Sequence, residues 1–247
     1  MAAPTTLHVD DSRGDRVHVI LDRPGSRNAI NATMVSELHV VCAELEARPR
    51  VLIISGENGV FASGADISEL RERRRDDALA GINSGLFVRI ARLPMPVIAA
   101  VDGWALGGGA ELAYAADFRL ASTAARIGNP ETSLGIIAAA GGTWRLSELV
   151  GEALAMEILL AGRTLNGEEA LAAGLVVSVH SPDELIAAAN GLADRIARQD
   201  PLAVRLTKTL IRAPRASHPA ADEAAQAVLF ESDEKYRRMT EFLEKKK

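Results

Sequence analysis

Two glutamates with the potential for acid–base chemistry, Glu111 and Glu131, lie twenty residues apart in the sequence. Glu111 ends a glycine-rich stretch, "ALGGGAEL", and Glu131 lies in "GNPETSLG". Carboxyl groups that share a small space favour holding a proton between them, which suits general acid–base catalysis. The sequence therefore predicts that Glu111 and Glu131 face one reaction space, and that the glycines at 107–109 bring backbone N–H groups into it.

The segment after these glycines is expected to form a helix. The first N–H groups of a helix have no intrahelical partner and form a partial positive pole. Gly108 precedes Glu111 by one helical turn, roughly 4.5 Å along the axis, so its N–H and the Glu111 carboxylate can border one cavity. By itself, the stretch is equally consistent with a tight strand-to-helix turn in which Glu111 is only a favourable first-turn acid.

A second glycine-containing loop, "FASGADI" at residues 61–67, follows an expected strand at 51–55. Gly64 permits an unusual turn that would expose the Ala65 N–H at the carboxyl end of a strand, where α/β proteins bind ligands. Two N–H groups from adjacent loops can hold one carbonyl oxygen as an oxyanion hole. The chain lacks the dinucleotide-binding, phosphate-loop and serine-nucleophile motifs.

The elements that must position these groups alternate between strands and helices. Apolar runs at 51–55 and 96–102 predict buried strands, and residues 6–11 and 16–22 alternate like a strand pair. A helix capped by Asn31 is expected before Pro49. From Pro182 onward the pattern is helical, over 182–199, 201–213, 219–230 and 232–246. This order predicts an α/β core at 1–190 and a helical C-terminal region at 191–247.

Composition excludes several classes of protein. The formal net charge of −5 gives no general attraction for nucleic acid or an anionic membrane. The single cysteine, Cys42, forms no internal disulfide, and the five histidines lack metal-ligand spacing. No signal peptide or membrane span is expected, so the predicted location is the cytoplasm.

The segments "FASGADI", "ALGGGAEL", "GNPETSLG" and "AGGTWRL" resemble, in order and spacing, the enoyl-CoA hydratase/isomerase (crotonase) superfamily. The resemblance runs from "LDRPGSRNAIN" to "EFLEKKK", nearly the whole chain. It implies a spiral of β-β-α units with a helical C-terminal region that assembles into homotrimers or homohexamers. It also implies an acyl-CoA thioester substrate, without a metal or other cofactor.

The resemblance assigns roles to individual residues. It places the thioester oxygen between the N–H groups of Ala65 and Gly108 and makes Glu111 and Glu131 the catalytic pair. It adds further substrate contacts, of which the last two come from a neighbouring subunit: Ala62, Ser63, Gly64, Asp66, Ile67, Gly107, Gly109, Pro130, Ala139, Phe242 and Lys245. For Asp66, a structural cap is favoured over a role as a catalytic acid.

The presence of both glutamates favours a hydratase that adds water to a trans-2-enoyl-CoA and gives a 3-hydroxyacyl-CoA. An enoyl-CoA isomerase, or another acyl-CoA lyase or hydrolase, is the alternative, since those branches keep one glutamate or neither. A non-catalytic RNA-binding or scaffold relative is a remoter one. The chain departs from typical hydratases at residues 138–140, where three alanines replace Pro-Gly-Ala. The Ala139 N–H is expected to hold the water if its backbone angles allow.

Overall fold

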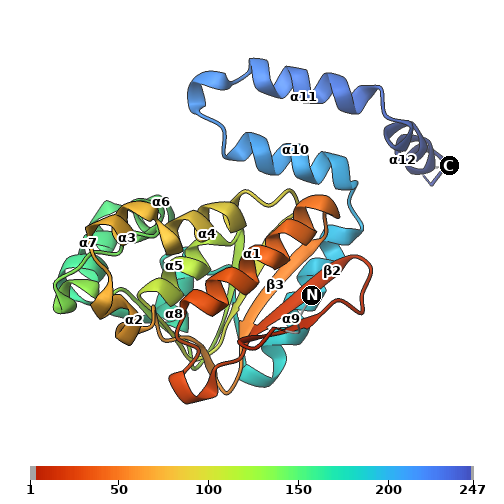
Figure 1. Cartoon of the computed structure of the whole chain (residues 1–247). Coiled ribbons are helices and arrows are strands. Elements are labelled where there is room, and N and C mark those ends of the chain that lie inside the picture. Colours follow the sequence, from red (N-terminus) through yellow and green to blue (C-terminus); the bar gives the residue numbers. More distant parts are fainter. Residues whose placement is uncertain (1–3, 246–247) are drawn as a thin grey trace. The chain divides into compact units, whose positions relative to one another are not determined.

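The computed structural model of this chain describes residues 4–245 (Figure 1). The chain forms two compact units, residues 1–193 and 194–247. The division falls within helix α9 (Pro182–Ala197), three residues after the boundary expected at 190. The first unit carries the sheets and the candidate site, and the second unit is helical.

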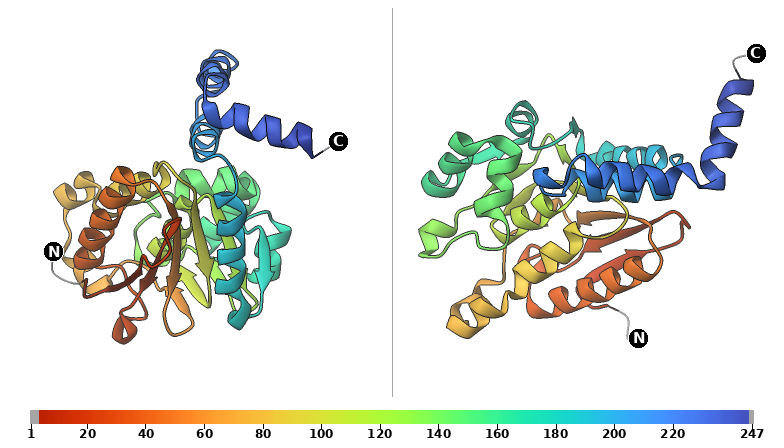
Figure 2. Two further views of the ribbon diagram at one scale, coloured as in Figure 1. Left: turned by 90° about the vertical axis from the view of Figure 1, so that its right-hand side faces the viewer. Right: turned by 90° about the horizontal axis from the view of Figure 1, so that it is seen from above.

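The larger sheet of the first unit has six strands in the order β1-β2-β3-β5-β7-β10. β1 and β2 pair antiparallel and the other neighbours pair parallel. Every residue of β5 and all but the last of β3 are buried, as expected for a sheet covered on both faces. Figure 2 shows α1 and α9 on opposite faces of this sheet. The strands are β1 (Leu7–Asp10), β2 (Arg16–Leu21), β3 (Val51–Gly56), β5 (Val97–Val101), β7 (Phe118–Ser122) and β10 (Ser178–His180).

A smaller sheet has four short strands in the order β4-β6-β8-β9, with only the β8–β9 pair antiparallel. The chain passes from a strand of the larger sheet to one of the smaller sheet, then through helical structure, and returns, which produces the expected spiral of β-β-α units. The four strands are β4 (Val60–Ala62), β6 (Trp104–Leu106), β8 (Arg126–Gly128) and β9 (Thr164–Asn166).

Helices connect and cover the strands. α1 begins after Asn31, whose side chain accepts the Met34 N–H at 2.9 Å, as predicted for its cap. α1 packs against α4, and α4 against the buried α5 (Figure 1). The helices of this unit are α1 (Ala32–Ala47), α2 (Ile67–Glu72), α3 (Arg75–Ala80), α4 (Ile82–Ala91), α5 (Gly108–Ala115), α6 (Ser147–Val150), α7 (Glu152–Ala161), α8 (Gly167–Ala172) and α9. Short 3₁₀ turns lie at 24–26 and 131–134, and a π-helical turn at 142–146.

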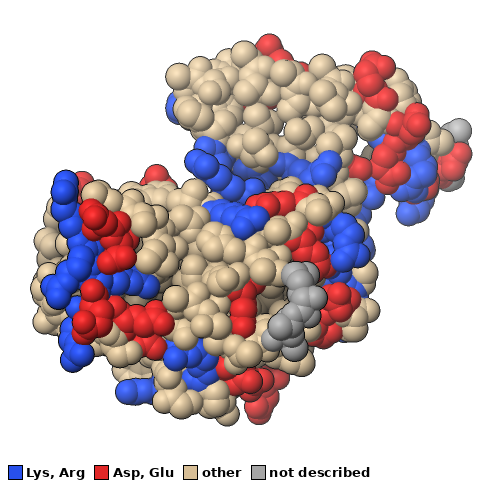
Figure 3. Space-filling model, viewed as in Figure 1, with Lys and Arg blue, Asp and Glu red and all other residues tan. Residues whose placement is uncertain are grey.

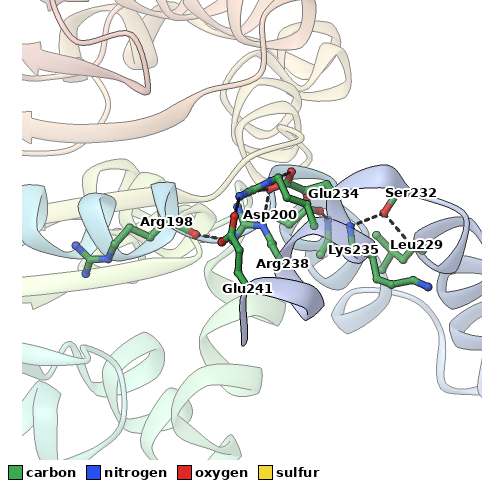
Figure 4. A network of polar contacts seen from close by, with 10 residues as sticks. Arg198, Asp200, Leu229, Ser232, Glu234, Lys235, Arg238 and Glu241 are labelled. Atoms are coloured by element: carbon green, nitrogen blue, oxygen red, sulfur yellow. Dashed lines mark hydrogen bonds and ion pairs between the residues drawn. The ribbon is translucent and has the colours of Figure 1, made fainter. Parts of the chain in front are cut away.

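The second unit consists of α10 (Pro201–Ile211), α11 (Ala220–Phe230) and α12 (Asp233–Glu244), with a 3₁₀ turn at 215–217. Polar contacts at its helix ends are shown in Figure 4. Ser232 caps α12, and Arg238 donates to Glu234 at 2.6 Å and to the Arg198 carbonyl at 2.9 Å. Within residues 4–245, no helix combines the length and hydropathy that a membrane span needs.

The predicted strand pair, the capped helix and the C-terminal helices are confirmed. The glycines at 107–109 come after the predicted strand at 96–102, but one more short strand lies between them. The chain turns at Gly103 and adds β6 before it reaches them. This extra strand belongs to the smaller sheet and carries α5 alongside β4.

Candidate active site

The N-terminus of α5 is pressed against the backbone of β4. A Cβ atom on Gly109 would lie 2.2 Å from the Ala62 carbonyl oxygen, so only glycine fits there. Gly107 directly precedes α5. Its backbone angles, a φ of 51° and a ψ of −124°, suit glycine alone. All residues of α5 are buried, which holds Glu111 in its first turn inside the protein.

The Ala65 N–H in the loop between β4 and α2 lies beside Gly108, the first residue of α5. A Cβ atom on Gly108 would be 3.3 Å from the Ala65 nitrogen. Ile30 fixes the Ala65 loop by donating to the Gly64 carbonyl at 2.8 Å and accepting from the Asp66 N–H at 2.9 Å. Within residues 4–245, neither the Ala65 nor the Gly108 N–H donates a hydrogen bond. The two donors are therefore available to one acceptor.

Glu111 is only 4% exposed, and one of its oxygens is held by a loop that lies far along the chain. Its Oε1 accepts the N–H groups of Ala140 at 2.7 Å and Gly142 at 2.9 Å. Burial raises the pKa of Glu111 to about 7, and the charge of Glu131 adds to the rise, while these N–H groups oppose it. Near neutral pH this carboxyl group can therefore both accept and release a proton.

Glu131 is 8% exposed and begins a 3₁₀ turn after Pro130. Its Oε1 accepts from Asn129 Nδ2 at 3.3 Å, whereas its Oε2 is buried and has no hydrogen-bond partner among residues 4–245. Burial is the main cause that raises the pKa of Glu131. The carboxyl group also borders the glycine turn, since a Cβ atom on Gly107 would lie 3.1 Å from Oε1.

The two glutamates share neighbours. A Cβ atom on Gly142 would lie 3.4 Å from Glu111 Oε1 and 3.5 Å from Asn129 Nδ2, the group that donates to Glu131. The structure thus brings Glu111, Glu131 and the glycines at 107–109 into one buried neighbourhood beside the Ala65 loop. A free oxygen of one carboxyl group and a fixed oxygen of the other give a site for moving a proton to or from a bound molecule.

Beside Glu131 lies a cavity of about 550 Å³. Its lining is mostly apolar and includes Ile137, Ala138, Met156, Leu159 and Leu160. The segment at 67–92, which contains α2, α3 and α4, contributes no residue to the lining of this cavity. Within residues 4–245, no three His, Cys, Asp or Glu side chains cluster in a way that could hold a metal ion.

Ala139 does not present its N–H to this neighbourhood as expected. The group donates to the Ile137 carbonyl oxygen at 2.9 Å, and the next N–H groups along the chain, those of Ala140 and Gly142, meet Glu111 instead. The three-alanine segment therefore turns tightly on itself. Ala138 of this segment lines the cavity, and the Ala140 N–H contacts Glu111.

Asp66 is a structural cap, as predicted. Its Oδ1 accepts the Ser68 N–H at 3.1 Å, which caps α2, and its Oδ2 pairs with Arg23 at 3.1 Å. These partners, first of all the Ser68 hydroxyl, lower the pKa of Asp66 below its usual value. An aspartate engaged in this way is poorly suited to donate a proton.

The remaining predicted contacts fall in two places. Ala62 ends β4, Ser63 and Gly64 lie on the loop that carries Ala65, and Ile67 begins α2. The Ser63 N–H donates to the Arg27 carbonyl oxygen at 3.1 Å, and Ile67 is 56% exposed. Phe242 and Lys245 lie in or directly after α12 of the second unit. Their proposed contacts concern a neighbouring subunit, which is outside this chain.

Sequence reasoning missed Tyr114, which lies one turn after Glu111 on α5. Its hydroxyl donates to Asn129 Oδ1 at 2.9 Å, and both residues are buried. A signal was present in the sequence, because residues three apart on a helix share a face. A tyrosine placed one turn after a catalytic candidate, among alanines and leucines, is a polar group that needs a buried partner.

Comparison with known proteins agrees with this geometry. Residues 15–247 match the family model described as enoyl-CoA hydratase/isomerase. The chain is similar to a short-chain-enoyl-CoA hydratase from Clostridium acetobutylicum, with 37% identity over 96% of this chain and 94% of the relative. It is also similar to the human mitochondrial enoyl-CoA hydratase domain-containing protein 2, with 42% identity over 78% of this chain and 69% of the relative.

The fold has close matches among solved structures. An enoyl-CoA hydratase from Bacillus anthracis superimposes with a TM-score of 0.92 and 31% identity, covering 98% of this chain and 97% of that structure. The similarity thus extends over both sheets and the C-terminal helices.

Proposed function

The chain belongs to the enoyl-CoA hydratase/isomerase family, and we propose that it is an enoyl-CoA hydratase that adds water to a trans-2-enoyl-CoA. The product is a 3-hydroxyacyl-CoA. The observation that carries this proposal is the pair of buried carboxyl groups, Glu111 and Glu131, beside two N–H groups that lack an acceptor within residues 4–245. Hydration of a conjugated thioester needs carboxyl groups that transfer protons and N–H groups that bind the thioester oxygen, close together.

The N–H groups of Ala65 and Gly108 receive the thioester oxygen. When water attacks C3, the electrons of the double bond move toward the carbonyl, and negative charge develops on that oxygen as an enolate. Fixed donors stabilise this charge more than they stabilise the neutral carbonyl, and each is typically worth about 3–4 kcal/mol of barrier. Binding of the oxygen here also places C2 and C3 toward the carboxyl groups.

The two glutamates orient the water molecule and transfer its proton. One carboxylate takes a proton from the water as its oxygen bonds to C3, and a proton is delivered to C2, so that H and OH are added in total. We assign the larger acid–base role to Glu131, whose Oε2 has no partner among residues 4–245. Glu111, with Oε1 held by two N–H groups, keeps its other oxygen in a fixed position to orient the water and share the proton transfer.

The same observation favours one alternative. If the two N–H bonds to Glu111 make it only a structural anchor for the loop at 138–142, Glu131 alone would move protons, as in an enoyl-CoA isomerase. That reaction shifts a double bond and needs one carboxyl group without bound water. The two functions differ in whether Glu111 is required for turnover.

The test is a hydration assay with crotonyl-CoA, which follows the loss of the absorbance of the conjugated thioester. We expect rapid loss with the wild-type chain and a fall in kcat of about 10²-fold or more in both Glu131→Gln and Glu111→Gln. The control is Glu168→Gln, which changes an exposed glutamate of α8. Coenzyme A binding, measured by calorimetry, should be unchanged in all three variants.

Each other outcome has a definite meaning. Unchanged turnover in Glu131→Gln would overturn its assignment. If no variant and no wild-type sample consumes crotonyl-CoA, but a 3-enoyl-CoA is converted to the conjugated isomer and Glu111→Gln is active, the isomerase replaces the hydratase.

The proposal includes the setting of the enzyme. It works as a homotrimer or homohexamer in the cytoplasm, needs no cofactor beyond the coenzyme A of the substrate, and receives Phe242 and Lys245 of a neighbouring subunit at its substrate. Nucleic acid is not a partner. On the visible face of the first unit, Figure 3 shows basic and acidic side chains intermixed. Ion pairs such as Arg71–Glu72 and Arg73–Glu69 agree with this mixture. Such a mixed surface supports a small-molecule enzyme over an RNA-binding relative.

A further inference from the structure

A buried polar chain leads from α5 to Glu131. Tyr114 is 3% exposed and Asn129 is 1% exposed. The Tyr114 hydroxyl donates to Asn129 Oδ1 at 2.9 Å, and Asn129 Nδ2 donates to Glu131 Oε1 at 3.3 Å. The same amide nitrogen lies 3.5 Å from the Gly107 carbonyl oxygen. Tyr114 on α5 is thus joined through Asn129 to Glu131 in one line of hydrogen bonds.

The direction of these bonds is set by chemistry. A carboxylate oxygen and a backbone carbonyl oxygen both need donors, so the NH₂ group of Asn129 must face Glu131 and Gly107. Its carbonyl oxygen then faces away from them and needs a donor of its own. Tyr114 supplies one, because the phenol stays protonated: burial, together with the charges of Glu111 and Glu131, raises its pKa above its usual value. Rotation of the Asn129 amide by half a turn would point its oxygen at the carboxylate.

We propose that Tyr114 and Asn129 are positioning residues that hold Glu131 Oε1 so that Oε2 faces the substrate. The inference rests on the proposed function, since it gives Glu131 its acid–base role. Oε1 is engaged by Asn129, whereas Oε2 is buried without a partner among residues 4–245. Tyr114 acts through Asn129 and touches no reacting atom. The pair therefore selects which oxygen of Glu131 exchanges the proton.

The proposal also accounts for a phenol in an otherwise apolar helix. The other residues of α5 from Leu112 to Ala115 are leucine or alanine, and all are buried. A buried hydroxyl group is costly unless it is hydrogen-bonded, so a phenylalanine would serve packing equally well. The hydroxyl group has its use in the bond to Asn129.

The first test is a double-mutant cycle measured as kcat and KM for crotonyl-CoA. We expect Tyr114→Phe to lower kcat about tenfold with little change in KM, the size that the loss of one bond in a charged network gives. Asn129→Leu should lower kcat further. Because Tyr114 acts through Asn129, the double variant should be no slower than Asn129→Leu alone. Ile54→Val, in the core of β3, is the control for a small loss of stability.

The second test does not depend on turnover. Infrared difference spectra between low and high pH follow the carbonyl stretch of the protonated carboxyl groups, and the signal that disappears in Glu131→Gln belongs to Glu131. The bond from Asn129 favours the charged form of Glu131 and lowers its pKa. Tyr114→Phe frees the amide to rotate, so the pKa of Glu131 should rise by about half a pH unit or more.

Additive losses of kcat in the cycle, or an unchanged Glu131 titration in Tyr114→Phe, would overturn the positioning role even if the wild-type chain is a good hydratase. Conversely, a wild-type chain that does not hydrate crotonyl-CoA would refute the proposed function, while the infrared titration would still decide whether Tyr114 controls Glu131. Equal losses in Tyr114→Phe and Ile54→Val would also count against the proposal, because they would reduce it to an effect of packing.

Discussion

At the scale of the residue, Glu111 combines two opposing influences. Burial disfavours its charged form, whereas the N–H groups of Ala140 and Gly142 favour it. Burial prevails, and the pKa rises to about 7. A water-exposed glutamate would be fully ionised at neutral pH and a weaker base. Burial of the ionised carboxyl group therefore destabilises the folded state, and it also gives the protein a group that exchanges protons near pH 7.

The raised pKa of Glu111 has a measurable effect on the stability of the fold. The pKa of Glu111 rises from 4.5 to about 7 on folding, so the folded state binds more protons between these pH values. The free energy of unfolding therefore falls as the pH rises through this window, by about 3 kcal/mol in total. Glu111→Gln carries no charge, and we expect it to be more stable than the wild type by about 3 kcal/mol at pH 8 and nearly equal at pH 4.5.

Urea midpoints at the two pH values, taken at one protein concentration, check this prediction. Glu168→Gln is the matched control and should follow the wild type at both. A Glu111→Gln variant that is less stable than the wild type at pH 8 would contradict it. In that case the two N–H bonds, and not burial, would dominate the energetics of the carboxyl group.

The candidate site could be predicted from the sequence only as far as its chemistry is local. Glu111, Gly108 and Ala65 lie in short segments whose glycines and spacing are informative, and the cap at Asp66 follows from the same loop. The bond between Tyr114 and Asn129 joins helix α5 to the loop directly after β8, and the Ala139 N–H in its turn donates to the Ile137 carbonyl oxygen. The sequence signals that Tyr114 needs a buried partner but not which one, because packing between segments decides it. The tight turn at Ala139 has no glycine or proline at that position to mark it.

At the scale of the element, the site depends on the close approach of α5 to β4. Gly109 lets the helix touch the Ala62 backbone, and this contact sets where the Gly108 N–H lies relative to Ala65. A side chain at position 109 would push the two loops apart. The two N–H groups proposed to hold the thioester oxygen and the packing of the helix thus depend on one contact between backbones.

We expect Gly109→Ala to destabilise the chain by about 3 kcal/mol, since its Cβ would lie 2.2 Å from the Ala62 oxygen. Any folded fraction should also hydrate crotonyl-CoA more slowly, because Gly108 moves with its neighbour. Gly85→Ala is the comparison, as nothing lies within 4 Å of its Cβ and it is exposed on α4. It should stabilise by about 0.5–1 kcal/mol. Urea unfolding of both variants measures the contrast, and equal effects would refute the close-approach argument.

Element prediction succeeded where the pattern was long. The strands β2 and β3 have six residues each and α1 has sixteen, which is enough for alternation, buried runs and a cap to be recognised. The smaller sheet escaped prediction because its strands have three residues each. Such strands exist through their pairing with distant segments, so β4 and β6 resembled loops in the sequence.

At the scale of the whole molecule, the helices of the second unit leave large apolar side chains in water. Ile211 is 79% exposed, Leu243 is 62% exposed and Phe242 is 59% exposed in the single chain. Exposed apolar groups of this size indicate an interface between proteins. They support the proposal that copies of this chain assemble as trimers or hexamers.

Light scattering after size exclusion tests this assembly. We expect the wild type to have three or six times the mass of the chain. Ile211→Glu should lower that mass, because the side chain is exposed within the chain and its apolar contacts would lie in a partner. Thr209→Glu changes an exposed polar residue of the same helix and should leave the mass unchanged. A wild type with the mass of one chain would refute the assembly and, with it, the contacts proposed for Phe242 and Lys245.

The two N–H groups that hold Glu111 have one more consequence. The amide resonances of Ala140 and Gly142 sense the charge on Oε1 directly, since each nitrogen lies within 3 Å of it. In a nitrogen–proton correlation spectrum, both peaks should move together as the pH passes through about 7. In a nitrogen-15-labelled sample, these two amides thus serve as built-in probes, with which the proton on Glu111 can be followed without a substrate or an attached reporter group.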